Sequence, residues 1–73
     1  MSETIIINLT KTVVAEMTKS YLELQYPEYS FKVVTYYSEL KHVVTHQPIE
    51  GEQLQQMQAY AQGVSDVLSK LLA

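Results

Sequence analysis

The sequence predicts a small α+β domain in which a helix, a β-hairpin and a second helix follow one another, with two helices covering one face of a small antiparallel sheet. Two segments carry apolar residues at helical spacing, one before residue 26 and one after residue 51. Between them, Ser30 to His46 is dominated by β-branched and aromatic residues. At 73 residues, the chain has the size of a single domain, residues 1–73.

The first helix is predicted from an apolar stripe between residues 9 and 25. The stripe consists of Leu9, Val13, Met17, Tyr21 and Leu24. Spacings of three and four residues place such side chains on one side of a helix, which is then expected to face the core. Pro27 disfavours the helical conformation at Tyr26, so the helix should end at Gln25.

Residues 4–8 allow two interpretations. The run from Thr4 to Ile7 is β-branched, which favours a strand, with Asn8 or Thr10 then capping the helix. However, Ile6 continues the apolar stripe backward, and Ser2 would cap a longer helix. The continued stripe favours the longer helix, and the choice decides between a sheet of two strands and one with an extra N-terminal strand.

The central segment predicts a β-hairpin with its turn at residues 38–39. This register puts Phe31, Val33, Leu40 and Val44 on the face covered by the helices. It puts Val34, Tyr36, Lys41 and Val43 on the opposite face. Ser-Glu is a poor two-residue turn, so a longer loop or a bulge is the alternative.

The second helix is expected from about Glu52 to Leu72. Its apolar stripe consists of Leu54, Met57, Ala61, Val64, Leu68 and Leu71, widened by Tyr60, Val67 and Leu72. Gly63 lies inside this helix, where glycine costs about 1 kcal/mol relative to alanine. Two interpretations of Gly63 are open: the helix packs closely against a neighbour at that point, or the glycine is simply tolerated.

Composition argues against several classes of partner. All five basic residues are lysine and they are dispersed, whereas nucleic-acid binding needs a concentrated positive surface and often arginine. The longest apolar run, Ile5 to Ile7, is far shorter than a membrane span or a signal peptide. We therefore expect a soluble cytoplasmic protein that binds neither nucleic acid nor membranes.

The residues offer little support for catalysis or metal binding. His42 and His46 would be close enough to share an ion on a helix, but on a strand they lie about 13 Å apart. The residues between them favour the strand, so local hydrogen bonds are expected there. Two glycines and no Gly-x-Ser-x-Gly motif leave neither a phosphate loop nor a nucleophile elbow. We expect no enzyme activity, no cofactor and no metal site.

The outer hairpin face is where a partner is expected. Val34, Tyr36, Lys41 and Val43 make this face more apolar than a solvent-facing sheet requires. A chain of this size without cysteine also gains stability from oligomerisation. The sequence thus predicts a non-catalytic protein-interaction or regulatory module that binds a second copy of itself, another protein, or both. The alternatives are a small acidic inhibitor or nucleic-acid mimic from a mobile element, and a ligand- or metal-binding module built on His42 and His46.

Overall fold

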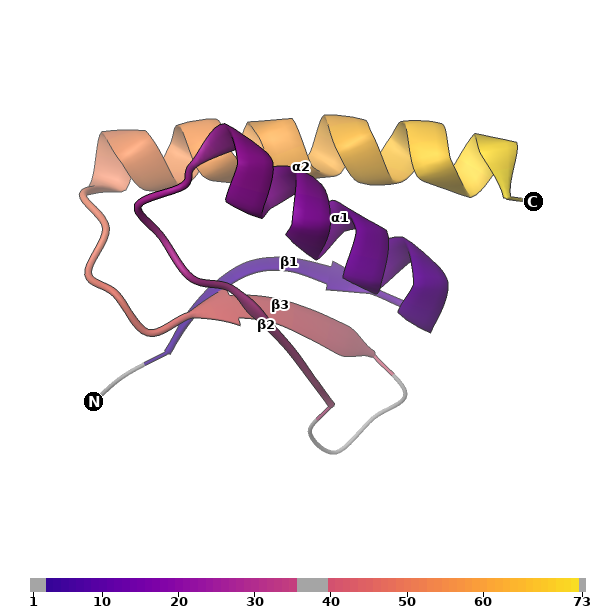
Figure 1. Ribbon diagram of the computed structural model, residues 1–73, viewed down its shortest axis with the longest axis horizontal. Coiled ribbons are helices and arrows are strands. Elements are labelled where there is room, and N and C mark those ends of the chain that lie inside the picture. Colours follow the sequence, from indigo (N-terminus) through magenta and orange to yellow (C-terminus); the bar gives the residue numbers. More distant parts are fainter. Residues whose placement is uncertain (1–2, 36–39, 73) are drawn as a thin grey trace.

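The computed structural model describes residues 3–35 and 40–72 of the chain, and it has the predicted α+β architecture (Figure 1). The elements in chain order are β1 (Thr4–Leu9), α1 (Thr12–Gln25), β2 (Lys32–Thr35), β3 (Lys41–Thr45) and α2 (Gly51–Leu71). The helix–hairpin–helix order is confirmed, and the N-terminal strand extends the sheet to three strands.

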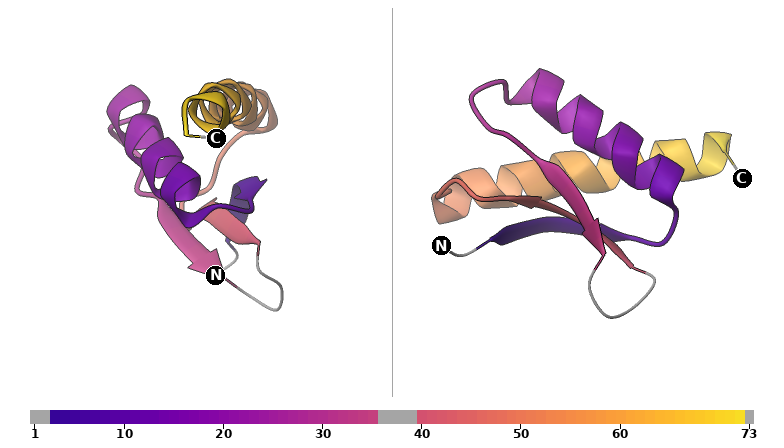
Figure 2. Two further views of the ribbon diagram at one scale, coloured as in Figure 1. Left: turned by 90° about the vertical axis from the view of Figure 1, so that its right-hand side faces the viewer. Right: turned by 60° about the horizontal axis from the view of Figure 1, so that its bottom comes forward.

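The sheet is antiparallel with the strand order β1-β3-β2, so the last strand in the chain is the central one. Both helices lie on the same face of the sheet, as the two views of Figure 2 show. Helix α1 contacts all three strands, whereas α2 contacts α1 and the edge strand β1. The molecule therefore has two layers, with one side of the helix layer and one face of the sheet left uncovered.

The N-terminal segment is a strand, and the longer helix favoured by the sequence pattern is wrong. β1 pairs with β3 from Thr4 to Leu9. The backbone N–H and C=O groups of this segment therefore form hydrogen bonds to β3, whereas in a helix they would bond to one another. The register shifts between Ile5 and Ile7, and this bulge lets both Ile6 and Ile7 reach the core. The β-branched residues thus follow their strand propensity, and α1 begins at Thr12.

The hairpin register differs by one residue from the register predicted with a turn at residues 38–39. Val33 pairs with Val43, and Thr35 pairs with Lys41. Residues 38–39, where the turn was predicted, lie outside the described residues. Because side chains alternate along a strand, this shift exchanges the two faces of β3. Phe31 and Val33 face the core as predicted, and Val43 joins their cluster. Val44 is also fully buried, but it lies outside that cluster.

Helix α1 buries a different side from the predicted one. Its buried residues are Val14, Ala15, Thr18 and Leu22, whereas most of the predicted stripe is exposed. Thr18 is fully buried, and its hydroxyl has no hydrogen-bond partner within the described part of the chain. The buried stripe of α1 is thus less apolar than the exposed stripe of Val13, Met17, Tyr21 and Leu24, which is unusual for a helix on a core.

Helix α2 buries the central part of the predicted stripe. Met57, Ala61 and Leu68 are in the core, joined by Ser65, while Leu71 is exposed. The two helices run antiparallel: the rings of Tyr26, just after α1, and Tyr60 pack edge to face with centroids 6.1 Å apart. As a result, the end of α1 lies beside the first half of α2, and the start of α1 lies beside the end of α2 (Figure 1).

A glutamine side chain joins the two loops at one end of the hairpin. The backbone N–H of Ser30 donates to Oε1 of Gln47 at 2.6 Å, and Nε2 of Gln47 donates to the carbonyl of Glu28 at 2.9 Å. Gln47 follows β3, while Glu28 and Ser30 precede β2. These hydrogen bonds fix the entry to the hairpin against its exit.

Candidate interaction surface

The four residues predicted to bind a partner do not form one surface. Val43 is fully buried in the core, between Ile7 of β1 and Val33 of β2. Lys41 lies two residues earlier in the same strand and therefore on the same side as Val43. Val34 is on the other side, paired with His42, and Tyr36 lies outside the described residues. That Val34 contacts a partner stays a prediction. The prediction that Val34 and Val43 lie on the same face of the sheet is wrong.

The two histidines belong to the strand region, as predicted, and each contacts a different residue near β1. His42 in β3 hydrogen-bonds through Nδ1 to Oδ1 of Asn8 in β1. His46 follows β3, and its Nε2 lies 3.3 Å from Oε2 of Glu3. The His42–Asn8 contact is a local hydrogen bond of the kind expected for a histidine at a sheet margin, and it links β1 to β3. The His46–Glu3 contact is an ion pair when His46 is protonated.

Within residues 3–35 and 40–72, no three or more His, Cys, Asp and Glu side chains gather in an arrangement that could hold a metal ion. In the same residues, neither helix combines the length and the apolar character needed to cross a lipid bilayer.

The largest concentration of exposed apolar side chains is on the helix layer, on the side that faces away from the sheet. Seven large apolar residues there are at least one-third exposed, and we call them the helical face: Val13, Met17, Tyr21 and Leu24 of α1, Val67 and Leu71 of α2, and Leu72 just after α2. Leu24 is 78% exposed and Leu71 is 74% exposed. Among the described residues, the helical face contains every exposed large apolar side chain except Ile5.

Two hollows between the helices connect the α1 and α2 parts of the helical face. The larger has a volume of ≈ 480 Å³ and is lined by Tyr21 of α1 with Tyr60, Val64, Val67 and Leu71 of α2. None of its lining residues is charged. The second hollow, of ≈ 440 Å³, places Val13 beside Leu72 at the other end of α1. The hollows therefore join residues of the helical face on both helices: Tyr21 with Val67 and Leu71, and Val13 with Leu72.

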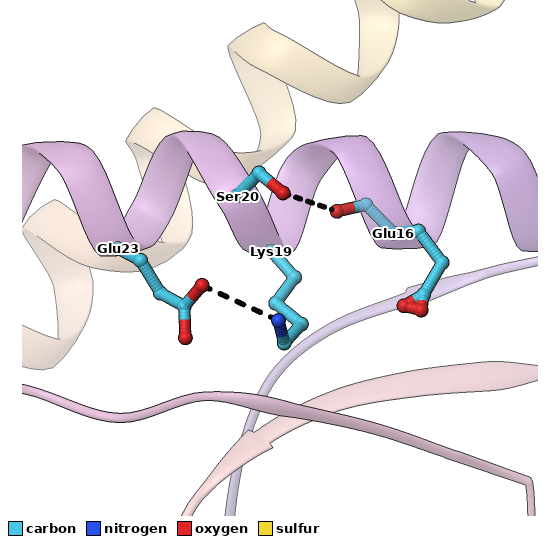
Figure 3. A network of polar contacts seen from close by, with 4 residues as sticks. All are labelled: Glu16, Lys19, Ser20 and Glu23. Carbon is cyan, nitrogen blue, oxygen red and sulfur yellow. Dashed lines mark hydrogen bonds and ion pairs between the residues drawn. The ribbon is translucent and has the colours of Figure 1, made fainter.

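The polar side of α1 lies next to this apolar stripe. Lys19 Nζ is 3.3 Å from Glu23 Oε1, one helical turn further on, and Ser20 Oγ donates to the carbonyl oxygen of Glu16 at 3.2 Å (Figure 3). The ion pair links residues of the same helix and is partly exposed, so it contributes little to stability. These polar groups lie on α1 outside the helical face.

Gly63 lines the larger hollow and is not closely packed within this chain. A Cβ atom built at this position would meet no other atom within 4 Å. Of the two interpretations that the sequence allowed, intramolecular close packing is therefore wrong. Glycine leaves α2 with an uncovered stretch of backbone in the middle of the helical face.

The sequence of α1 contains two apolar stripes, and the helical face is formed by the one predicted to lie in the core. That prediction, for the stripe through Val13, Met17 and Tyr21, is wrong. A second stripe follows one residue later, at Val14 and Thr18 and onward, and it is the buried one. A short helix that carries two apolar stripes exposes one of them when it packs on a single sheet, and this duplication was the signal for the helical face.

Comparisons with known proteins give no match. No protein-family model matches the chain, and no curated protein or solved structure matches it either. Function is therefore inferred from the surface of this chain alone.

Proposed function

We propose that the protein is a non-catalytic protein-interaction or regulatory module that binds its partner through the helical face. The observation that supports this proposal is the size of the apolar area. Residues of these types expose on the order of 150 to 250 Å² each when unfolded, so the exposed fractions of the seven side chains amount to about 700 Å². The largest apolar patch of an ordinary monomer is about 300 to 600 Å².

The free energy available from covering this area is large for a small domain. At about 25 cal/mol per Å², burial of 700 Å² corresponds to roughly 17 kcal/mol of transfer free energy. Only part of it becomes affinity, because association restricts motion and orders side chains. The part that remains after these costs is what would favour a bound state over a surface left in water.

The chemistry of the face also favours a protein partner over a small polar ligand. The larger hollow is lined by aliphatic and aromatic side chains and carries no charge. A Tyr hydroxyl at Tyr21 or Tyr60 gives it a polar tip without a charged group, which is typical of the centre of protein interfaces. Charged residues such as Lys19 and Glu23 lie outside it and would form the rim.

Site-specific photo-crosslinking tests this proposal. A benzophenone amino acid replaces Val67 on the helical face, or Gln58 on the exposed side of the same helix as a matched control. In the cells that produce the protein, the probe at position 67 should give a discrete protein adduct that the probe at position 58 does not give. The adduct should also be lost with Leu71→Glu, which adds a charge to the face.

If position 67 gives no more adduct than position 58, the helical face has no protein partner and the proposal fails. The same follows if Leu71→Glu leaves the adduct unchanged, because the contact would then not depend on the apolar surface.

A further inference from the structure

We infer that the helical face binds a second copy of this chain, with the helices of the two copies antiparallel across a two-fold axis. This inference rests on the proposed function and names its partner. It follows from the exposed area, the distribution of charge along the helix layer, and the open backbone at Gly63.

The area of the helical face matches what a stable dimer needs. A specific interface of standard size buries about 800 Å² on each partner. Seven apolar side chains of the helical face supply about 700 Å² by the estimate above, and polar residues at the rim supply the rest. A two-fold axis brings identical patches together, so one copy's face covers the other's completely and leaves neither exposed.

Charge is distributed unevenly between the two ends of the helix layer. Lys11 precedes α1, and it lies with Ser69 around the hollow at the end of α2, where Lys70 is also located. At the opposite end, Glu50 and Glu52 mark the start of α2. One end of the layer is therefore basic and the other acidic.

The middle of the helix layer carries three carboxylates, Glu16, Glu23 and Asp66, against one lysine, Lys19. Asp66 accepts a hydrogen bond from Gln62 Nε2 at 2.9 Å, and Glu16 is exposed on α1. Lys19 and Glu23 neutralise each other. The contrast between the ends comes mainly from the two lysines and from the glutamates at the start of α2.

This asymmetry favours one of the two ways in which identical faces can meet. If the helices of the two copies run parallel, the acidic end of one copy lies on the acidic end of the other. If they run antiparallel, each acidic end lies on a basic end, and the helix dipoles of the two α2 helices also oppose one another favourably. Each copy has a net charge of −3, so two copies repel one another. Contacts between acidic and basic ends in the antiparallel arrangement offset this repulsion.

Gly63 is the position at which the two-fold axis of the antiparallel arrangement would cross α2. It lies near the middle of α2, which spans Gly51–Leu71, and it lines the uncharged hollow. Since no atom of this chain occupies the space that a Cβ would take, the backbone of α2 is open to a neighbouring helix at this point. A two-fold axis near Gly63 would bring α2 of both copies together there, with Val67 of each copy beside Ala59 of the other.

Sedimentation equilibrium tests whether the partner is a second copy. Wild type should be a dimer at roughly 100 μM, a concentration well above the micromolar dissociation constants of many specific complexes. Val67→Glu should raise the dissociation constant by about 100-fold or more, because it buries an unpaired carboxylate in the interface. Gln58→Glu adds the same charge outside the helical face and should leave the dimer intact. Far-UV circular dichroism confirms that both variants are folded, since positions 58 and 67 are exposed.

Single cysteines test the orientation, since the chain has no native cysteine. Under mild oxidation, Gly63→Cys should form a disulfide-linked dimer, and Glu52→Cys should not. In the antiparallel arrangement, two copies of position 52 are separated by roughly 33 Å, given a rise of about 1.5 Å per residue from an axis at Gly63. In a parallel arrangement, both positions would be close to their counterparts.

The outcomes separate this inference from the proposed function. A wild-type monomer at roughly 100 μM overturns the second copy as partner. If the photo-crosslink at position 67 then joins a different protein, the proposed function still stands. Cross-linking at position 52, whether or not position 63 also cross-links, overturns the antiparallel arrangement. A dimer that survives Val67→Glu overturns the assignment to the helical face.

Discussion

Val43→Lys is the sharpest test of the hairpin register, because the two candidate registers predict opposite results. In the structure Val43 is fully buried in the central strand, between Ile7 and Val33. In the register with a turn at residues 38–39, it would lie on the face that the helices do not cover. Val44 on that face is itself fully buried, but a long lysine stem there can carry its ammonium group to water. The substitution therefore reports directly on which side of the sheet this residue occupies.

The expected cost comes from two effects that add. Loss of the buried valine side chain removes about 1.5 to 3 kcal/mol. Transfer of an ammonium group into the core adds several kcal/mol more, since no described carboxylate lies in that core cluster to pair with it. A domain of 73 residues has a total unfolding free energy of roughly 4 to 11 kcal/mol, so the variant should be largely unfolded at 25 °C.

The assay is urea unfolding followed by far-UV circular dichroism, with Val34→Lys as the matched control. Val34 is half-buried on the opposite face of the sheet, paired with His42. A lysine there can lie along the sheet with its ammonium group in water, so it should cost about 1 kcal/mol. If Val43→Lys has the same urea midpoint as wild type, the register and the core described above are refuted.

Three further substitutions test individual features of the fold by the same urea measurement. Thr18→Val should raise the unfolding free energy by about 1 kcal/mol, because it replaces a buried hydroxyl that lacks a described hydrogen-bond partner with a methyl group of similar shape. A loss of stability would show that the hydroxyl is hydrogen-bonded in solution. Gly63→Ala should also stabilise by about 1 kcal/mol when made in the Val67→Glu background, where association is removed, because an added Cβ meets no neighbour in α2. No gain would mean that the space is already occupied. Gln47→Ala should destabilise by about 1 to 2 kcal/mol through the loss of its hydrogen bonds to Ser30 and Glu28, while Gln55→Ala on the exposed side of α2 should change little. Equal effects of these two glutamine variants would contradict the bridging role of Gln47.

The element order could be predicted because its signals are local. Pro27 ends α1 at Gln25, and the stripe around Met57 and Leu68 defines α2. The strand character of the hairpin followed from its β-branched residues. The N-terminal strand was the harder case, because Ile6 fits a strand and a helical stripe equally well, and only pairing with the distant β3 decides between them.

The faces could not be predicted because they depend on contacts between elements. Whether the connection between β2 and β3 has an odd or an even number of residues decides whether Val43 or Val44 faces the helices. The residue types in that connection do not specify this number. On α1, the stripe through Met17 is more apolar than the stripe through Thr18, so hydrophobicity alone selects the wrong side. The candidate interaction surface was therefore expected on the sheet rather than on the helices.

The strand order has a consequence for how the chain folds as it is synthesised. β3 is the central strand, and its partner β1 is separated from it by more than thirty residues, as the Asn8–His42 contact shows. Until β3 has left the ribosome, β1 has no neighbour, and α1 has no sheet on which to bury Val14 and Leu22. The first half of the nascent chain should therefore remain unfolded with both apolar stripes of α1 exposed, and it is the stage at which a chaperone would be most useful.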